Sequence, residues 1–242
     1  MRARALALFV LSLGLVFSSA DAAEERREIV LAATDNGRPA HEILTEAFRR
    51  AGYSVKIRFM PWVRCLADAK AGVIDGVFGA TRTPRRESEF LFTDEVLWQE
   101  VQAAFARADD RGDYRPTVDG LADARVGLMN GSATGAEFDQ AIAGKRLRHV
   151  EFATSFDSLL LMLTGQRVDV IIADRWSVMG VARQHGVLDK VREVTPPVLD
   201  DPVYVAFTRA RDMSGVSRDF SAALRAMKQD GSYGEIFARQ SR

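Results

Sequence analysis

The sequence predicts an α/β fold made of two lobes, each a mixed, mostly parallel sheet flanked by helices. Strand-like and helix-like segments alternate along the 242 residues, and such alternation favours parallel strands joined by helical crossovers. Two segments rich in polar residues or proline, 107–113 and 196–202, interrupt the alternation. We therefore expect residues 23–106 and 203–242 to form lobe 1 and residues 107–202 to form lobe 2.

The first lobe begins with a predicted buried strand over 27–34. A helix over 39–50 follows, because apolar residues recur at helical spacing until the glycine at position 52 ends the pattern. Apolar and polar residues then alternate over 54–59, as in a half-buried strand. A helix over 62–71 and a strand over 73–80 continue the alternation.

The second lobe is expected to repeat the alternation, after a strand around 101–105 and the polar segment. Its predicted elements are a strand over 125–129, a turn over 130–132, a helix from Thr134, a strand near Val150, a helix over 155–164, a strand over 168–173 and a helix from Arg175. A strand over 203–207 and a final helical region then return the chain to lobe 1. The two hinge crossings are expected near Ala106 and Pro202.

One short pattern occurs in both lobes. In 66–75 and again in 160–169 a helix is followed by a glycine, an aspartate and an apolar strand, and the strands end in polar residues at 81–82 and 174–175. Ligands of open α/β sheets bind outside the carboxyl ends of the strands, so both polar ends are expected to face one cleft between the lobes. Glycine after a helix is also an ordinary C-cap, so the pattern alone is weak evidence.

The N-terminus has the features of a cleavable signal peptide. Arg2 and Arg4 precede an uncharged apolar run over 5–17, and the small residues of 18–22 fit cleavage near Ala22. The run is shorter than the ~20 residues that a membrane span requires, and no similar run follows. We expect a soluble mature chain that is exported to the periplasm. An uncleaved anchor is the alternative.

The composition excludes several function classes. Lysine plus arginine equals aspartate plus glutamate at 33 each, and the charges are interspersed, so no nucleic-acid or anionic-membrane partner is expected. A single cysteine, Cys65, rules out an intrachain disulfide and is interpreted as a small core residue rather than a nucleophile. The three histidines lack metal-ligand spacing, so neither a metal nor another cofactor is expected.

Several segments occur in an order that is typical of one protein family. They are PWVRCL at 61–66 with GVIDG at 72–76, TPRR at 83–86 with FTD at 92–94, RVD at 167–169 with Asp174, and ALRAMKQDGSYGEI at 223–236. On these segments the chain resembles the extracellular solute-binding proteins of family 3, which serve mainly amino-acid uptake and share the type II periplasmic-binding-protein fold. The resemblance implies a monomer that binds an amino acid or related zwitterion without catalysis and delivers it to an ABC permease.

The same resemblance assigns the principal ligand contacts. Arg86 matches the arginine that binds the ligand α-carboxylate, and a guanidinium suits a planar carboxylate because two parallel charge-assisted bonds form at once. Asp174 matches the aspartate that takes the α-ammonium, and it is also a candidate N-cap for the following helix. By composition alone, residues 85–87 would form a solvated turn. We expect Arg86 to lie in an exposed cleft and to support little packing.

Four further candidates lie on lobe 1. Trp62 matches the aromatic residue that stacks on the ligand side chain, although a core position is equally compatible with the pattern. Arg64 follows it at the start of the same helix. Gly79 and Thr81 precede the arginine motif, where the family uses backbone and hydroxyl groups around the ligand.

The chain departs from the family pattern at two places. The loop 34–39 contains the candidate ligand contact Asp35 and runs almost directly into a helix, so a longer segment and its aromatic residue are missing. Ser132 is expected to open a helix whose N–H groups and positive dipole end would hold a carboxylate. Ala133 stands where amino-acid binders commonly have a second hydroxyl residue. These two departures leave a modified or unusual small molecule open as the ligand.

Two other functions stay open. Relatives of the family include a dehydratase that acts on cyclohexadienyl substrates, so a periplasmic enzyme is the main alternative. Its proton donor would be Asp35, Asp94, Asp174 or Glu95. A sensory subunit that delivers ligand to a signalling partner is the third possibility, and the fold alone does not decide among them.

Overall fold

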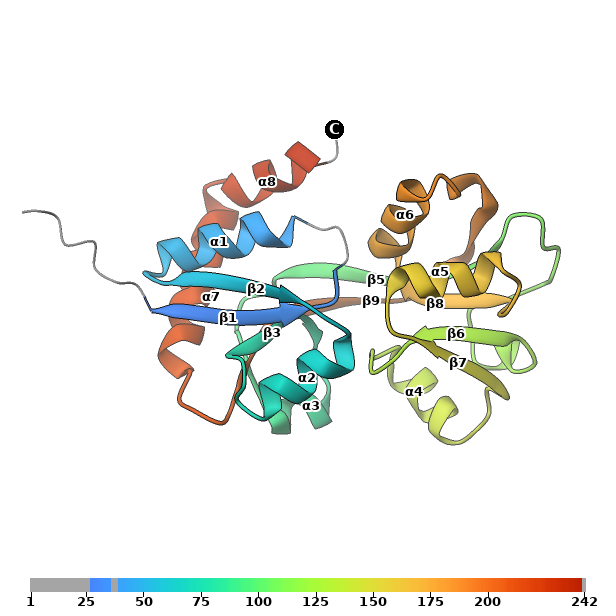
Figure 1. Cartoon of the computed structure of the whole chain (residues 1–242), viewed down its shortest axis with the longest axis horizontal. Helices are drawn as coiled ribbons and strands as arrows, with labels where there is room; N and C mark the ends of the chain where they lie inside the picture. The colour runs from blue at the N-terminus through green and yellow to red at the C-terminus, as the bar shows by residue number, and fades with distance from the viewer. Residues whose placement is uncertain (1–26, 36–38, 241–242) are drawn as a thin grey trace, which may run out of the picture.

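The computed structural model describes residues 27–35 and 39–240, and its strands form one nine-stranded sheet. The strand order is β2-β1-β3-β9-β5-β8-β6-β7, with β4 paired to β9. Figure 1 shows two lobes, the first built from both ends of the described chain and the second from its middle. None of the helices in this described part is long and apolar enough to span a membrane. The predicted signal peptide, residues 1–22, lies outside the described residues.

The first lobe contains parallel strands with helices on both faces. β1 pairs in parallel with β2 and β3, and β3 pairs with the antiparallel β9. Helix α1 and helix α8 lie on one side of the sheet and α2 and α3 on the other (Figure 1). Helix α7 packs with α1 in the same core cluster. The elements are β1 (Glu28–Ala33), α1 (Ala40–Arg50), β2 (Ser54–Phe59), α2 (Trp62–Lys70), β3 (Gly76–Thr81), α3 (Pro84–Glu89), β4 (Phe90–Phe92), α7 (Ser214–Gln229) and α8 (Ser232–Gln240).

Helix α1 forms where the sequence predicts it, because its apolar residues share one face. Ile43, Leu44 and Phe48 are fully buried in a core cluster that also includes residues of β1, β9 and α7. The ring of Phe48 lies 4.6 Å from that of Phe220 in α7, measured between centroids. Burying a large apolar side chain contributes roughly 1.5–3 kcal/mol. The C-terminal helices therefore complete the core that the N-terminal segments begin.

The second lobe repeats this architecture on a smaller scale. Strand β6 lies between β7 and β8 and is parallel to both. One core cluster packs α5 and α6 against β8 through Leu159 and Ile171, and another packs α4 through Phe138 and Ile172. The elements are β6 (Arg125–Met129), α4 (Ala136–Ala143), β7 (His149–Ala153), α5 (Phe156–Thr164), β8 (Val170–Asp174) and α6 (Arg175–Gln184).

Two long antiparallel strands, β5 (Trp98–Arg107) and β9 (Val191–Thr208), connect the lobes. β9 pairs with β3 as far as Val203, whereas β5 pairs with β8 only from Gln102 onward. Residues 99–101 and 200–202 therefore pair only with each other within the main sheet. Pro202 lies in this two-stranded connection, where it pairs with Gln99. Ala106 pairs with Val170 in β8 and so lies inside the second lobe.

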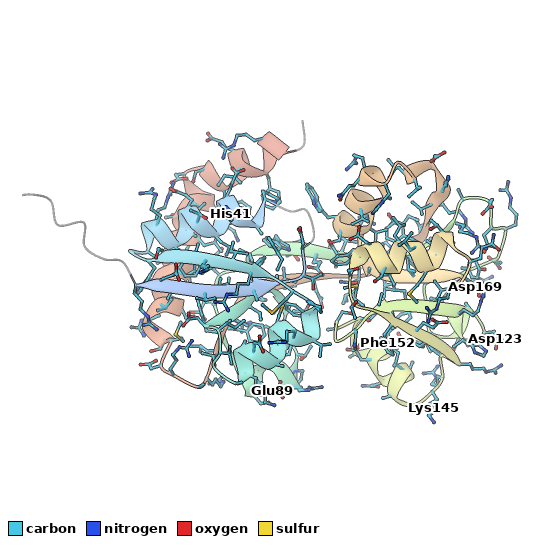
Figure 2. The ribbon with its side chains drawn as sticks, viewed as in Figure 1. His41, Glu89, Asp123, Lys145, Phe152 and Asp169 are labelled. Atoms are coloured by element: carbon cyan, nitrogen blue, oxygen red, sulfur yellow. The ribbon has the colours of Figure 1, made fainter. Side chains whose placement is uncertain are left out.

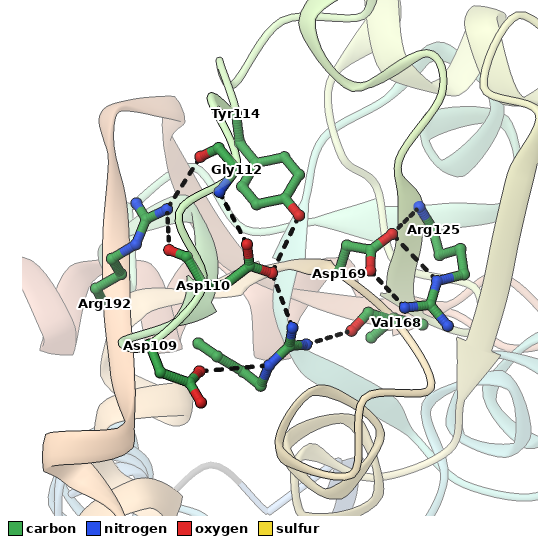
Figure 3. A network of polar contacts seen from close by, with 9 residues as sticks. Asp109, Asp110, Gly112, Tyr114, Arg125, Val168, Asp169 and Arg192 are labelled. Carbon is green, nitrogen blue, oxygen red and sulfur yellow. Dashed lines mark hydrogen bonds and ion pairs between the residues drawn. The ribbon is translucent and has the colours of Figure 1, made fainter.

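The polar segment 107–113 follows β5 at the end remote from the first lobe. Asp110 organises it: its carboxylate accepts hydrogen bonds from Arg107 Nη2 at 2.8 Å, from the Gly112 N–H at 2.9 Å and from the Tyr114 hydroxyl at 3.1 Å (Figure 3). Arg192 Nη2 donates to the carbonyl oxygens of Asp110 and Gly112. The segment is thus a hydrogen-bonded loop at the end of the second lobe, and the crossing between lobes precedes it.

The repeated glycine–aspartate pattern has the same structural role in each lobe. Asp75 Oδ2 accepts from the Val30 N–H at 2.8 Å, and Asp169 Oδ2 accepts from the Arg125 N–H at 2.9 Å. Each aspartate also binds an arginine side chain, Arg211 for Asp75 and Arg125 for Asp169. Figure 2 places Asp169 at the end of the second lobe remote from the first. Both aspartates therefore fix the start of a strand.

Candidate ligand-binding site between the lobes

Both lobes and their connecting strands line one cavity. The side chains enclose about 630 Å³ of empty space, including the opening to solvent. Aromatic and apolar groups with a few convergent polar groups make up the wall, as is typical of small-molecule sites. The sequence-predicted residues that line it are Trp62, Gly79, Thr81, Arg86, Ser132 and Asp174.

Arg86 is positioned by the N-terminus of α3. Thr83 caps this helix by accepting a hydrogen bond from the Arg86 N–H at 3.2 Å, and proline occupies the first helical position. The guanidinium donates from Nη1 to the carbonyl oxygen of Thr81 at 3.1 Å and from Nη2 to that of Gly131 at 3.0 Å. Because Thr81 belongs to the first lobe and Gly131 to the second, this side chain bonds to both.

The expected environment of Arg86 needs correction. The residue is 8 % exposed, so it is buried rather than displayed in an open cleft. Burial lowers the pKa of the guanidinium below its usual value, and the carboxylates of Asp139 and Glu100 oppose that effect. Its removal would also leave two carbonyl oxygens without their donor, which typically costs about 1–3 kcal/mol per buried group. Arg86 thus supports the structure as well as lining the cavity.

Trp62 stands beside Arg86 at the start of α2. The guanidinium carbon lies 5.6 Å from the centroid of its ring, within the range of a cation–π interaction. Gly131 approaches the same place from the second lobe, where a Cβ atom would lie 2.9 Å from Val63 Cγ2. Its φ of +77° also favours glycine. A residue without a side chain is therefore what lets the two lobes touch here.

Asp174 ends β8 and caps α6. Its Oδ2 accepts hydrogen bonds from the Ser177 N–H at 2.9 Å and from the Ser177 hydroxyl at 2.6 Å. The predicted N-cap is thereby confirmed. The residue is 3 % exposed and also lines the cavity, so the cap fixes the carboxylate at the cavity wall.

Gly79 and Thr81 reach the cavity through an irregularity in β3. The register with β9 shifts between Phe78 and Ala80, and Gly79 between them has a φ of +73°. Bulges of this kind bend a strand and redirect the residues that follow. The carbonyl oxygen of Thr81 then accepts the hydrogen bond from Arg86.

The turn after β6 differs from the expected helix start. The helix begins at Ala136 rather than at Thr134, because Gly135 has a φ of +98° that no helical residue adopts. Ser132 donates its hydroxyl hydrogen to the carbonyl oxygen of Met129 at 2.8 Å. The Thr134 N–H is bound by Asp139 Oδ1 at 3.1 Å. The anion-binding helix terminus predicted at Ser132 is therefore absent from this described turn, although Ser132 still lines the cavity.

Two predicted contacts do not line the cavity. Arg64 is two residues after Trp62 on the same helix, and such residues point in nearly opposite directions. Its side chain is 70 % exposed, with Nε bonded to Asp68 at 3.0 Å. Asp35 is exposed as well, and its neighbour Thr34 lines the cavity instead.

Several lining residues escaped the sequence interpretation, among them Glu100, Gln102, Phe156 and Ser177. Glu100 and Gln102 come from β5, and Gln102 Nε2 donates to Glu100 Oε1 at 2.8 Å. Phe156 and Ser177 come from the first turns of α5 and α6. Alternation along β5 puts residues 100 and 102 on one face, which is the signal that could have revealed them.

Cys65 and Glu95, two of the residues considered for catalysis, do not line the cavity. Cys65 is fully buried, and burial raises the pKa of its thiol to about 12, which disfavours a thiolate nucleophile. Of the candidate proton donors, Asp174 lines the cavity, whereas Glu95 is bonded to Arg225 and Lys228 of α7. Among the described residues, no three His, Cys, Asp or Glu side chains lie together in a way that could hold a metal ion.

A family comparison decides what kind of protein this is. The model of the bacterial extracellular solute-binding proteins, family 3, matches residues 39–240. The chain belongs to that family. Binding of a small amino-acid-type solute is what this family supports. No curated protein matches the chain by sequence.

Solved structures share the fold. A histidine kinase sensor domain with similarity to periplasmic binding proteins has a TM-score of 0.78 and 17% identity, and the match covers 89% of this chain and 96% of that one. A mutant of ArgBP from T. maritima has a TM-score of 0.75 and 17% sequence identity, and the match covers 88% of this chain and 94% of that one. The arginine-, lysine-, histidine-binding protein ArtJ from Geobacillus stearothermophilus has a TM-score of 0.73 and 16% sequence identity. That match covers 88% of this chain and 95% of the other. The predicted type II periplasmic-binding-protein fold is confirmed.

Proposed function

We propose that the protein binds an amino acid or a related zwitterion between its lobes. In this proposal Arg86 holds the carboxylate and Asp174 the ammonium group. The observation that carries it is that these two buried residues of opposite charge come from different lobes and line the same cavity. A dipolar solute that bridges them would hold the lobes together, as in hinge closure around a ligand.

The geometry around Arg86 supports carboxylate binding. A guanidinium carries more N–H donors than the bonds to Thr81 and Gly131 use, and its fork suits a planar carboxylate. Because the group is largely removed from water, each charge-assisted bond there is stronger than it would be at the surface. Trp62 and Phe156 supply apolar walls for the rest of the ligand.

Location and partners complete the proposal. The basic and apolar pattern of residues 1–22 supports export and cleavage near Ala22, and a periplasmic site of action follows from it. The closed pair of lobes would present a composite surface to an ABC permease in the inner membrane. We propose that the chain acts as a monomer and without catalysis.

A sensory role is the second candidate. One structural neighbour is a histidine kinase sensor domain, and the likeness covers 89% of this chain. The same cavity would then report ligand to a signalling partner instead of delivering it for transport. The two roles are separated by the partner that co-purifies with the ligand-bound protein, a permease complex or a membrane kinase.

Thermal shift with a panel of amino acids tests the proposal. A ligand that binds only the folded state stabilises it by about 2.7 kcal/mol at a hundred times its Kd, so at least one amino acid is expected to raise the Tm. Arg86→Lys, which keeps the charge but loses the fork, should reduce that rise. The proposal fails if no amino acid shifts the Tm of the wild type, or if purified protein turns over prephenate or arogenate.

A further inference from the structure

Two contacts within the chain join the lobes, one on each side of the connecting strands. On one side, Arg86 of the first lobe donates from Nη2 to the carbonyl oxygen of Gly131 in the second lobe at 3.0 Å. On the other side, Phe237 of α8 meets the ring of Trp176 in α6 edge to face. Figure 1 shows that α6 and α8 lie on the same side of the sheet. We call these pairs the arginine contact and the aromatic contact.

The arginine contact is fixed from the side of the first lobe. Nη1 of Arg86 donates to the carbonyl oxygen of Thr81 at 3.1 Å, and the guanidinium carbon lies 5.6 Å from the centroid of the Trp62 ring. These partners hold the guanidinium in one orientation while Nη2 bonds to Gly131. The side chain is also buried, and a charge-assisted bond shielded from water is stronger than one at the surface. Separation of the lobes would therefore break a strong bond.

The aromatic contact depends on a helix that is anchored in the first lobe. The Tyr233 hydroxyl donates to the carbonyl oxygen of Leu97 at 2.6 Å, and Ile236 is buried in the core of the first lobe. The ring of Phe237 also packs against that of Tyr233, with centroids 5.1 Å apart. Helix α8 thus moves with the first lobe, and Phe237 would leave Trp176 if the lobes separated.

The connection between the lobes allows such a separation. Residues 99–101 and 200–202 pair only with each other within the main sheet. Hinge motion between lobes is usually absorbed by a few residues in connections of this kind. Because the two contacts lie on opposite sides of the connection, bending in either direction pulls one of them apart. The two contacts therefore oppose opening.

We propose that the arginine contact and the aromatic contact keep the lobes closed before any ligand binds, so that the resting protein is closed and opening is the transient event that admits a solute. Both contacts consist of atoms of this chain, so neither needs a ligand. The inference goes beyond the proposed function, and its test contains no ligand. A failure of amino-acid binding would leave this inference standing.

Double electron–electron resonance measures the distance between the lobes. Spin labels are placed at Val73→Cys in the first lobe and Leu161→Cys in the second, because these side chains are 65% and 64% exposed. The native Cys65 is fully buried, and burial raises the pKa of its thiol to about 12, so it stays unlabelled. Mass spectrometry of the denatured sample verifies that no solute has remained bound. We expect one main distance, that of the closed structure, with less than about a tenth of the molecules open.

Gly131→Ala tests the arginine contact without changing Arg86. The new Cβ would lie 2.9 Å from Val63 Cγ2, so the lobes are pushed apart and the ratio of open to closed molecules should rise roughly tenfold or more. Gly186→Ala is the matched control in the second lobe. Gly186 also has a positive φ, +64°, but a Cβ there would have no atom within 4 Å. The control carries the same kind of backbone strain and should keep the wild-type distance.

A double-mutant cycle tests the aromatic contact independently. Trp176→Ala and Phe237→Ala should each raise the ratio of open to closed molecules roughly two- to tenfold. The double variant should raise it no further than the larger single effect, because both changes remove the same contact. Circular dichroism verifies that each variant is folded.

Each outcome decides the inference. A closed wild type, opening in Gly131→Ala but not in Gly186→Ala, and non-additive effects of the two ring variants support it. A ligand-free wild type that is mostly open overturns it. So does a distance distribution of Gly131→Ala that equals that of Gly186→Ala. Additive effects of Trp176→Ala and Phe237→Ala also overturn it, because the rings would then act through other contacts.

Discussion

Trp176 in α6 and Phe237 in α8 form an edge-to-face aromatic contact, with ring centroids 6.3 Å apart. The two helices belong to different lobes and lie on the same side of the sheet (Figure 1). The hydrogen bond from Arg86 to Gly131 joins the lobes near α2, on the other side. The lobes are therefore in contact both above and below the strands that connect them.

Trp176→Ala is expected to weaken ligand binding without unfolding the protein. An aromatic pair contributes roughly 0.5–1.5 kcal/mol beyond its buried area, so the Kd should rise roughly two- to tenfold. Calorimetry measures this, and small-angle scattering of the ligand-bound variant should show a larger radius of gyration. Leu188→Ala, at an exposed site of the second lobe, is the control. An unchanged Kd in Trp176→Ala would exclude a role of the aromatic contact in closure.

Gly131→Ala is expected to keep the lobes apart. The new Cβ would lie 2.9 Å from Val63 Cγ2, and a φ of +77° disfavours alanine by roughly 1–2 kcal/mol. Ligand affinity should fall, and the Tm should fall modestly. Adding Val63→Ala removes the clash between the new Cβ and the valine side chain but leaves the backbone strain at position 131. Recovery of affinity without recovery of Tm in the double variant supports this account, whereas no recovery of affinity contradicts it.

Replacement of Asp174 should separate its two roles. Asparagine caps helices about as well as aspartate, so Asp174→Asn should keep the bonds to Ser177 and lose only the charge. We expect a Tm near that of the wild type and at least tenfold weaker binding of amino acids. Asp174→Ala should lose about 1 kcal/mol of stability in addition. Chemical denaturation and calorimetry measure the two effects, and wild-type affinity in Asp174→Asn would remove the carboxylate from the ligand site.

Acid should destabilise the protein partly through Glu46. Hydrogen bonds from the side chains of Arg49 and Arg50 lower the pKa of Glu46 from 4.5 to about 2. The folded state therefore binds fewer protons than the unfolded state between these values, and stability present above pH 4.5 is lost as the pH falls through this window. Glu46→Gln should flatten the dependence of Tm on pH there. Parallel curves for variant and wild type would show that the ion pairs contribute nothing.

The regular elements could be predicted because their signals are local. Helix α1 and strands β6 and β8 follow from apolar periodicity, which reports the buried face of each element directly. The start of α4 could not be placed, because it depends on the backbone of Gly135 and on the bond between Thr134 and Asp139. The segment 107–113 was interpreted as a crossing, since polar residues mark ordinary loops as well.

The candidate site was predictable only where a motif carried it. Arg86, Asp174 and Trp62 follow from the family pattern, and all three line the cavity. The burial of Arg86 depends on the approach of Gly131 from the other lobe, which is a tertiary relationship without a sequence signal. Glu100 was missed because a charged residue in a connecting strand looks solvent-facing until both lobes are present.

The chain leaves the first lobe through β5 and returns through β9, and this path fixes an order of assembly. Val203, Val205 and Phe207 of β9, with Phe220 and Leu224 of α7, belong to the core of the first lobe. A ribosome completes the segments of the second lobe before it makes any of these residues. The first lobe is therefore the last to complete its core. Until β9 and α7 have been made, the apolar surface of its early strands stays uncovered.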